Sequence, residues 1–345
     1  EMVARLLWHV IIERAKTNCT RQNRCTGGRD VMATLKDVAK LANVDVSTVS
    51  RALNNTSYVH PDTKKKIFKA VEQLSYRPNL LAKGLKQGKR RTLGVVVPSV
   101  NLSIFGEIVQ GIEMQAGNRG YSLMICLTKD DPDIEAECLN RLRNGLVDGI
   151  LIASTGQNTR LIRDIKANGV AVVQLVRNQD RKFSSVEADC FSCGYEAAKY
   201  LYKKGCTKIG FINGSTEFTP YAERYRGYHK AMKELSLKEY QVESGLPRGN
   251  YFKDGYKGVE RLKEAFDDVD GIMVAADMQG IGVLRALKES GKKVPEEVKV
   301  ISLTGHAIGG MLETAMTSME LPGREMGQRA ADMILEDIEA ADDEK

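Results

Sequence analysis

Residues 34–53 read TLKDVAKLANVDVSTVSRAL, and this stretch decides the architecture of the amino-terminal part of the chain. Apolar residues recur at helical spacing in both of its halves: Leu35, Val38, Ala39 and Ala42 in the first, and Val49, Ala52 and Leu53 in the second. Between them, Asn43-Val44-Asp45 forms a turn that places Asp45 at the N-cap of the second helix. The spacing predicts two short amphipathic helices joined by a tight turn, a helix-turn-helix.

A third helix is expected over Pro61–Leu74. Pro61 suits the first helical position, where its missing N–H costs nothing. The apolar residues of this segment again fall at helical spacing and are expected to be buried: Ile67, Ala70, Val71 and Leu74. Three such helices are enough for a small domain.

Positive charge is concentrated on this part of the chain. Residues 33–91 hold thirteen Lys and Arg against four Asp and Glu, a net of +9, whereas the whole 345-residue chain is only +6. A basic run is usually a solvated face, but one confined to a helix-turn-helix is better explained by nucleic acid. The alternative is an ordinary helical domain that never touches DNA.

The second helix of the pair is thin enough to enter a major groove with its outer face. That face is formed by Val46, Ser47, Ser50, Arg51 and Asn54. DNA binding is therefore the first functional hypothesis.

Three strings extend this pattern: TLKDVAKLANVDVSTVSRALN at 34–54, YVHPDTKKKI at 58–67 and LSYRPNLLAKGL at 74–85. Together they resemble the DNA-binding headpiece of the lactose-repressor/galactose-repressor (LacI/GalR) family of bacterial transcription regulators. The resemblance implies that Val46 and Ser47 choose the base sequence and that Ser50, Arg51 and Asn54 support groove and phosphate contacts. It also implies phosphate contacts for Thr34, Tyr58 and Asn79.

Residues 78–85 are similar to the hinge helix of that family, which orders on operator DNA when two subunits pair. The resemblance makes Leu85 the apolar wedge in the minor groove, with Ala82 one turn earlier against the same groove. The alternative is a linker helix whose Leu81 and Leu85 pack on the next domain. Gly84, Gly88 and the run 89–91 favour the conditionally ordered hinge.

From residue 92 onward, apolar runs alternate with amphipathic helices, which predicts an α/β fold of parallel sheets with right-handed crossovers. Short buried strands are expected at Leu93–Val97, Leu123–Leu127, Gly149–Ile152, Val170–Leu175, Ile209–Ile212, Ile272–Ala275 and Val298–Leu303. Helices are expected at Phe105–Arg119, Ile134–Arg143, Gly194–Lys203, Gly258–Phe266, Gly280–Glu289 and Gly323–Ala341. About 250 residues suffice for two doubly wound lobes, and ligands of such sheets bind beyond the carboxyl ends of strands.

The resemblance continues through this region, in LGVVVPS (93–99), VDGILI (147–152), AAKYLYKKGCTKIGFING (197–214), AERYRGYHKA (222–231) and AADMQGIGVLRAL (275–287). It implies a periplasmic-binding-protein-like core whose two lobes close on a small effector. Arg224 falls where the family places an effector-binding arginine, the alternative being a surface arginine on a helix.

Further effector contacts are expected around that arginine. Asp277 follows a strand and is expected to accept from ligand hydroxyls, although it could instead cap the next helix. Phe105 could stack on a sugar ring or simply pack in the core. Thr304 and His306 lie beyond the strand that ends near Leu303, with His306 and Arg177 as candidate replacement contacts.

Three departures from the family pattern bear on the effector. Ala276-Asp277 stands where the family often has Asn-Asp, Thr304-Gly305-His306 stands where it often has an Asp, and Val176 replaces another frequent Asp. Each loss removes a partner for sugar hydroxyls. The effector is therefore expected to be a disaccharide, a phosphorylated sugar or absent, and a protein corepressor is an alternative regulator.

Both ends of the chain differ from the family pattern. Residues 1–31 contain an apolar run at 6–12 that is too short for a transmembrane span, and Met32-Ala33-Thr34 resembles a native start. We therefore expect residues 1–31 to be a non-native or disordered extension. Relatives usually continue into one more strand, so a truncated carboxyl end, with an open sheet edge, is also expected.

Other chemistries find little support. Seven scattered cysteines suggest no disulfide framework, and Cys190-Phe191-Ser192-Cys193 lacks the second pair that a metal site needs. Neither a phosphate-binding loop nor a nucleophile elbow occurs. We expect no enzyme activity, cofactor or metal. A periplasmic sugar-binding protein would share the core but would carry no helix-turn-helix, and free thiols favour a cytoplasmic protein.

The sequence thus predicts a helix-turn-helix domain over 32–77, a hinge helix and linker over 78–91 and a two-lobed effector-binding and dimerisation domain over 92–345. The expected partners are double-stranded operator DNA, a sugar or sugar phosphate, and a second copy of the chain in a homodimer, or two dimers in a tetramer. No membrane partner is expected. The expected function is a repressor of carbohydrate-utilisation genes.

Overall fold

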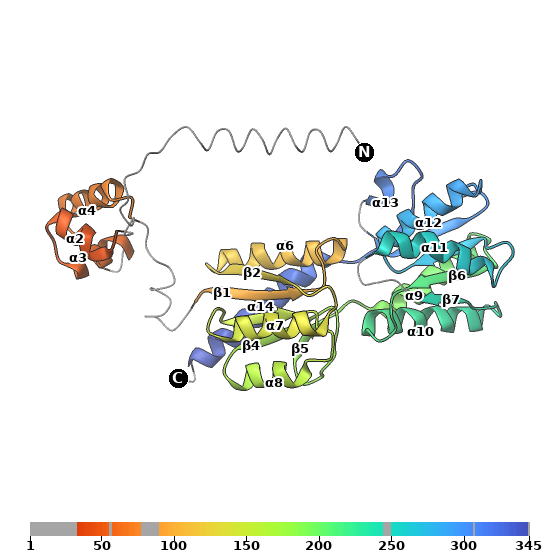
Figure 1. Ribbon diagram of the computed structural model, residues 1–345, viewed down its shortest axis with the longest axis horizontal. Coiled ribbons are helices and arrows are strands. Elements are labelled where there is room, and N and C mark those ends of the chain that lie inside the picture. Colours follow the sequence, from red (N-terminus) through yellow and green to blue (C-terminus); the bar gives the residue numbers. More distant parts are fainter. Residues whose placement is uncertain (1–32, 55–56, 77–89, 244–249, 306–307, 344–345) are drawn as a thin grey trace. The chain divides into compact units, whose positions relative to one another are not determined.

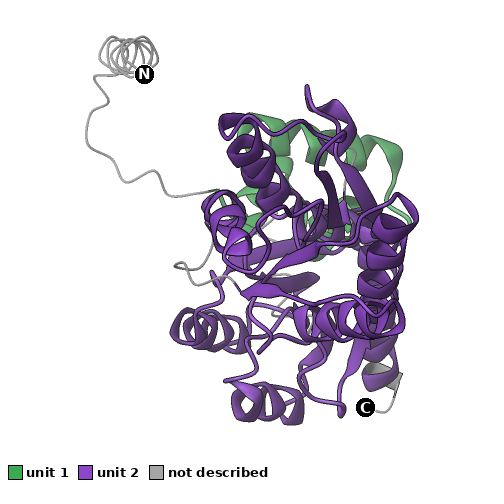
Figure 2. Cartoon of the chain, turned by 90° about the vertical axis from the view of Figure 1, so that its right-hand side faces the viewer, with its two compact units in different colours: residues 1–83 green, residues 84–345 purple. Residues whose placement is uncertain are grey.

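The computed structural model describes residues 33–54, 57–76, 90–243, 250–305 and 308–343 (Figure 1). The chain divides into two compact units, residues 1–83 and residues 84–345 (Figure 2). Among the described residues, no helix is long and apolar enough to cross a membrane.

The described part of the first unit contains three helices. They are α2 (Leu35–Ala42), α3 (Val46–Asn54) and α4 (Pro61–Gln73). Their apolar stripes meet in one small core formed by Val38, Ala39, Ala42, Val49, Ala52, Ile67 and Ala70. The helix-turn-helix prediction and the third helix are confirmed, although Val71 and Leu74, which were expected to be buried, are only partly so.

The second unit contains two lobes, each built on a parallel sheet. The first sheet has the strand order β2-β1-β3-β4-β5. Its strands are β1 (Thr92–Val97), β2 (Ser122–Leu127), β3 (Gly149–Ile152), β4 (Ala171–Leu175) and β5 (Ser184–Val186). The helices of this lobe are α6 (Ser103–Asn118), α7 (Pro132–Arg143), α8 (Thr159–Ala167) and α14 (Gly323–Asp343).

Both faces of the first sheet are covered, because successive strand residues point to opposite sides. Val95 packs with α6 and α14 on one face, and Val96 packs with α7 and α8 on the other. This double burial explains why β1 reads as a continuous apolar run rather than as an alternating one.

The second sheet has the order β10-β9-β8-β6-β7. Its strands are β6 (Ile209–Asn213), β7 (Gln241–Glu243), β8 (Gly271–Val274), β9 (Lys299–Gly305) and β10 (Thr317–Glu320). Helices α9 (Cys190–Lys203) and α10 (Thr219–Glu234) cover one face, and α11 (Tyr251–Lys263) and α12 (Asp277–Glu289) cover the other. A short helix, α13 (Ile308–Met311), precedes β10.

The chain passes from the first lobe to the second after β5, and it returns after β10, when α14 packs along α6 of the first lobe (Figure 1). The α/β prediction of two doubly wound lobes is confirmed. Helices α8, α10 and α13 and strands β5, β7 and β10 were not predicted. The three strands are only three or four residues long and mostly polar, so their apolar signal is weak.

One predicted strand differs in character from the prediction. Residues 123–127 were expected to be buried, but β2 pairs only with β1 and forms an edge of the sheet. Met124, Ile125 and Leu127 are therefore exposed. The apolar run was identified correctly as a strand, but the prediction of its burial was wrong, because burial depends on position in the sheet and not on hydropathy alone.

Pairs of glycines allow three helix pairs to cross at very short distances. A Cβ at either glycine of a pair would lie between 1.9 and 2.1 Å from a backbone oxygen of the facing helix. The pairs are Gly111 and Gly327 for α6 and α14, Gly194 and Gly227 for α9 and α10, and Gly255 and Gly282 for α11 and α12. A methyl group at any of these positions requires the helices to separate.

We predict that Gly227→Ala destabilises the protein by about 2 kcal/mol, because the new methyl would overlap the Phe191 carbonyl oxygen at 2.0 Å. Alanine is favoured over glycine inside a helix by about 1 kcal/mol, so the overlap outweighs a real gain. The matched control is Gly117→Ala in α6, where a Cβ meets nothing within 4 Å and should stabilise slightly. Urea denaturation compares the two, and equal effects would contradict this account of the crossing.

Candidate functional site

Two candidate sites lie in separate units, and the first is the outer face of α3. Helix α2 ends at Ala42, and its C-cap Asn43 has a φ of 52°, which turns the chain sharply. Asn tolerates this left-handed conformation better than most residues. The Asp45 carbonyl then accepts from the amides of Thr48 (2.9 Å) and Val49 (3.1 Å), which starts α3. The predicted three-residue turn therefore sets the direction of α3.

The start of α2 is fixed by a reciprocal cap. The Thr34 hydroxyl accepts from the Asp37 amide at 3.4 Å, and the Asp37 carboxylate accepts from the Thr34 amide at 2.8 Å and hydroxyl at 2.7 Å. These hydrogen bonds lower the pKa of Asp37. Thr34, predicted to contact phosphate, lies on the surface. Because it also caps α2, it has a structural role as well.

The outer face of α3 carries the side chains that the sequence proposed for base contacts. Val46 is 39% exposed. Arg51 donates to the Ser47 carbonyl (3.3 Å) and hydroxyl (3.4 Å), and Asn54 donates to the Ser50 carbonyl (2.8 Å). Ser47, Arg51 and Asn54 are exposed, whereas Ser50 is half-buried. The longer side chains thus lie along their own helix.

Tyr58, another predicted phosphate contact, is 83% exposed between α3 and α4. Such exposure of an aromatic side chain contributes little to the stability of the free protein. Three further predicted contacts, Asn79, Ala82 and Leu85, lie outside the described residues, as does almost all of the predicted hinge at 78–91.

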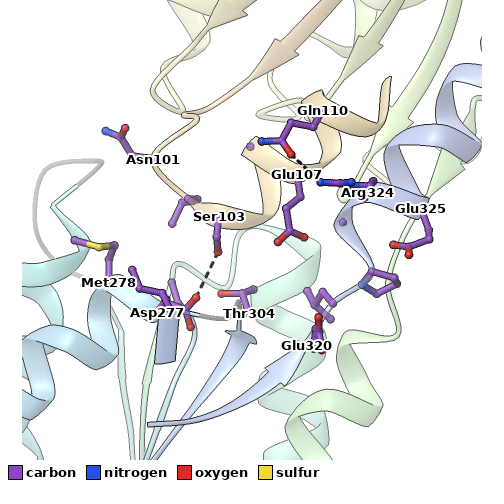
Figure 3. A pocket seen from close by; sticks show the side chains of 17 residues that line it. Asn101, Ser103, Glu107, Gln110, Asp277, Met278, Thr304, Glu320, Arg324 and Glu325 are labelled. Atoms are coloured by element: carbon purple, nitrogen blue, oxygen red, sulfur yellow. Dashed lines mark hydrogen bonds between the residues drawn. The ribbon is translucent and has the colours of Figure 1, made fainter. Parts of the chain in front are cut away.

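The second candidate site is a cleft between the two lobes of the second unit. An outer cleft of about 880 Å³ lies between the start of α6, the start of α12 and residues 320–325 (Figure 3). A smaller inner pocket of about 30 Å³ adjoins it. Leu102, Ala276, Thr304 and Leu321 line both. The cleft lies at the carboxyl ends of the strands, where doubly wound sheets bind ligands.

Arg224 lines the inner pocket from helix α10. Its side chain is 3% exposed, so the alternative of a surface arginine is wrong. One guanidinium nitrogen donates to the Ala275 carbonyl at 3.2 Å, and the ring of Tyr221 lies 5.7 Å away. Its Nε is buried without a hydrogen-bond partner among the described residues. Burial raises the pKa of the neighbouring Cys190 thiol, an effect that Arg224 opposes.

The other predicted effector residues surround these pockets. Phe105 is buried in the core of the first lobe, as one interpretation expected, and it also lines the inner pocket. Its stacking on a sugar ring stays a prediction. The Thr304 hydroxyl donates to the Ala275 carbonyl at 2.9 Å. Asp277 begins α12 and accepts from the Ser103 hydroxyl at 3.4 Å, across the two lobes (Figure 3). His306 lies outside the described residues.

A buried ion pair next to the inner pocket was missed by the sequence reasoning. Arg177, which follows β4, donates to Asp130 at 2.6 Å, and both residues are buried. Its guanidinium also stacks on the ring of Phe218 in the second lobe, 3.9 Å from the centroid. Asp130 follows β2 in a left-handed conformation with a φ of 58°. The Arg177–Asp130 ion pair of the first lobe is therefore in contact with an aromatic ring of the second lobe.

Two tyrosines of the second lobe complete this cluster. Burial raises the pKa of both Tyr221 and Tyr251. Both therefore remain neutral donors and acceptors at physiological pH. No group of three or more metal-ligating side chains occurs in the described ranges.

Comparisons with known proteins agree with this geometry. Residues 34–79 match the family of "Bacterial regulatory proteins, lacI family". Residues 90–345 match "Periplasmic binding proteins and sugar binding domain of LacI family". The HTH-type transcriptional regulator RegA of Clostridium acetobutylicum is 32% identical over 319 residues, which cover 90% of this chain and 94% of RegA.

Two solved structures extend the comparison. The structure titled "transcriptional regulator CelR-cellobiose complex" is 26% identical, with a TM-score of 0.64, and the match covers 89% of this chain and 94% of that one. The lac repressor dimer bound to operator and the anti-inducer ONPF is 22% identical, with a TM-score of 0.78 over 90% of this chain and 93% of that one. The second likeness is one of fold.

We predict that Asp130→Asn lowers the free energy of unfolding by about 3 kcal/mol, because it leaves the Arg177 guanidinium buried without its counter-charge. The matched control is Asp164→Asn. Its partner Arg143 lies at 3.3 Å, but both side chains are largely exposed, so the loss should stay below about 1 kcal/mol. Chemical denaturation at neutral pH measures both. A similar small loss for the two variants would show that the buried pair contributes no more than a surface pair.

Proposed function

The chain belongs to the LacI family of bacterial transcription regulators, and on that premise we propose that it is a repressor of carbohydrate-utilisation genes. A small effector bound between its lobes sets its affinity for operator DNA. The single observation that carries this proposal is the presence of both parts in one chain. A helix-turn-helix with an exposed polar face is followed by a two-lobed unit with a cleft at the carboxyl ends of its strands.

In the proposed division of labour, residues 32–77 bind DNA, residues 78–91 form the hinge and residues 92–345 bind the effector and a second subunit. Helix α3 enters the major groove and presents Val46 and Ser47 to the bases. Thr34, Tyr58 and Asn79 contact phosphates, and the net charge of +9 over 33–91 supports such contacts.

The proposed effector site is the inner pocket together with the outer cleft. Arg224, Phe105 and Thr304 line the first, and Asp277 and Thr304 line the second. The regulator whose structure is titled as a complex with cellobiose supports a small ligand for a chain of this fold. A ligand that binds one lobe arrangement more tightly shifts the population toward it.

The proposed operator-binding form is a homodimer that reads a pseudo-palindromic site. Support comes from the exposed apolar edge formed by Met124, Ile125 and Leu127 of β2, together with Met114 of α6. An unpaired, apolar sheet edge is a liability for a monomer and is stabilised when a second copy covers it. The lac repressor of similar fold is described as a dimer on its operator.

The direct test is fluorescence anisotropy of the whole protein with labelled DNA from upstream of its own gene and from the genes that surround it. We expect tight binding to one site, weaker and salt-sensitive binding to unrelated DNA, and release by a small molecule. Equal affinity for all sequences at every salt concentration would contradict the proposal.

We predict that Val46→Ala combined with Ser47→Ala lowers affinity for the preferred site by about 10- to 100-fold and leaves binding to unrelated DNA nearly unchanged. Side chains that contact bases contribute about 1–3 kcal/mol of discrimination, whereas phosphate contacts act on all sequences alike. Lys65→Ala, an exposed lysine of α4, is the control and should affect all sequences equally, if at all. The assignment of α3 as the recognition helix is wrong if the double variant keeps its full preference.

We predict that Ile125→Arg, on the edge strand β2, converts the protein to a monomer and lowers operator affinity at least about tenfold. The side chain is 46% exposed, so the folded subunit should tolerate the arginine, while a charge buried at an interface is costly. The control is Tyr202→Arg, an equally exposed apolar position on α9 in the other lobe. Light scattering gives the oligomeric state, and a dimeric Ile125→Arg variant with full affinity would exclude this edge.

A further inference from the structure

We propose that Cys190 and Cys193 form a redox-sensitive site, at which hydrogen peroxide or an organic hydroperoxide oxidises the two thiols to a disulfide and thereby weakens operator binding. This inference rests on the proposed function, because it names a regulation of the two-lobed unit that controls operator binding. It concerns a C-x-x-C motif, residues 190–193, for which the proposed function gives no role.

Both cysteines lie in the first turn of α9, where the chain enters the second lobe. Cys190 is the first residue of this helix and Cys193 is the fourth. Only residues 187–189 separate β5 of the first lobe from α9. A C-x-x-C pair at the start of a helix in an α/β protein is typical of thiol-disulfide redox motifs. The pair therefore lies directly after one of the connections between the lobes.

The spacing of the motif brings the two sulfurs close together. Residues three positions apart share one face of a helix, with Cβ atoms about 5–6 Å apart. A disulfide requires Cβ atoms about 3.5–4.5 Å apart, so the first turn of α9 must tighten when the bond forms. The Cys193 amide donates to the Asp189 carbonyl at 3.2 Å, and this is a helical hydrogen bond that the tightening strains. The oxidised and reduced forms of α9 therefore differ in shape at the first turn.

Two cavities give an oxidant access to Cys190. Although its exposed fraction is only 6%, the residue lines the inner pocket. It also lines a second cavity of about 330 Å³, whose other walls include Arg181, Phe191 and Glu223. Hydrogen peroxide is little larger than a water molecule, which occupies about 30 Å³ in the liquid, so both cavities can admit it. The Cys190 thiol is therefore the one that reacts first.

Oxidation proceeds in two steps that together remove two electrons from the sulfurs. The Cys190 thiolate attacks one oxygen of hydrogen peroxide, the O–O bond breaks, and the departing hydroxide takes up a proton and leaves as water. The product is a sulfenic acid. The Cys193 thiol then attacks the sulfenic sulfur, the S–O bond breaks, and a second water carries away the Cys193 proton. Two thiols thus become one disulfide, and one peroxide is reduced to two water molecules.

The surroundings of the thiols make the first step slow. Burial raises the pKa of both thiols, and Arg224 of α10 opposes the rise. A thiol with a raised pKa is mostly protonated at neutral pH, and the thiolate is the nucleophile, so brief contact with peroxide leaves the pair reduced. Once a sulfenic acid forms, the second thiol one helical turn away converts it to a disulfide. The pair therefore responds to sustained oxidation.

The tightened turn alters the contact between the lobes. Cys193 packs against the hydrophobic core of the first lobe. A Cβ at the next residue, Gly194, would lie 2.1 Å from the Arg224 carbonyl oxygen of α10, so α9 has no room to move in that direction. The first turn therefore moves relative to the first lobe and loses packing there. Loss of this packing disfavours the lobe arrangement that binds operator, and operator affinity falls.

The first experiment asks whether the disulfide forms in the folded protein. The reduced whole protein is incubated with hydrogen peroxide, and its remaining thiols are then blocked with iodoacetamide under denaturing conditions. Trypsin releases residues 183–199 as one peptide that contains both cysteines. We expect mass spectrometry to find this peptide unblocked and two hydrogens lighter, and dithiothreitol to reverse the change. Cys206, a buried thiol of the same lobe, is the internal control and should stay reduced. A fully blocked peptide, or equal oxidation of Cys206, would overturn the proposal.

The second experiment measures operator affinity before and after the same treatment, by fluorescence anisotropy with DNA from upstream of the protein's own gene. We expect oxidation to lower the affinity at least about fivefold and dithiothreitol to restore it. Cys193→Ser should bind as tightly as the reduced protein and should not respond to peroxide. The matched control is Cys126→Ser, which removes another half-buried thiol and should respond like the unaltered protein. A disulfide that leaves the affinity unchanged, or a loss that persists in Cys193→Ser, would contradict the proposal.

Two further comparisons keep these outcomes distinct. Cys193→Ala, a second variant of the same position, guards against a loss of folding caused by the serine hydroxyl and should behave like Cys193→Ser. A failure of the proposed function has a different signature, because the reduced protein would then bind the upstream DNA no more tightly than unrelated DNA.

Discussion

Parallel strand pairing is the constraint on which the rest of the second unit depends. In a parallel sheet all strands run in one direction, so their carboxyl ends lie at the same end of the sheet and the loops that follow them gather there. Arg177 follows β4, Asp130 follows β2, and Asp277 follows β8. Residues as far apart in the sequence as Arg177 and Thr304 thereby line adjoining pockets. The cleft exists because the carboxyl ends of the strands of two such sheets face one another, and not because any one motif encodes it.

That geometry places the two buried arginines of the cleft in different electrostatic surroundings. The Arg177–Asp130 pair is satisfied internally and stacks on Phe218 of the other lobe, so it serves the contact between lobes. Arg224 is held at the edge of the same cluster by the close crossing of α9 and α10, where Gly194 and Gly227 meet the facing backbones. Its Nε has no hydrogen-bond partner among the described residues. Of the two buried arginines of this pocket, only Arg177 forms an ion pair within the described part of the chain.

Hydrophobic patterning predicted most of the fold. Runs such as Gly149–Ile152 and Ile209–Ile212 are strands because both of their faces are covered. Patterning could not reveal that β2 lies at an edge, since strand order depends on contacts far apart in the sequence. It also missed β5 and β7, whose three residues each carry too little apolar signal. The effector-binding role proposed for Arg224 came from family resemblance. Asp130 was not found, because only the left-handed turn at 129–130 directs it back toward Arg177.

The central claim is that the arrangement of the two lobes sets the affinity for operator DNA. The most direct measurement joins the lobes by a disulfide between Ser103→Cys and Asp277→Cys, whose native side chains meet at 3.4 Å across the cleft. Operator affinity is then measured in the oxidised and reduced states, with and without the small molecule that releases the unaltered protein. Because Asp277 also lines the proposed effector site, Asp277→Cys alone is the control, and it is expected to need a higher concentration of the small molecule for release. The account predicts that the reduced double variant releases operator at the same concentration as this control and that the oxidised double variant does not. Equal release in both states would contradict it, because operator affinity would then not depend on the movement of the lobes.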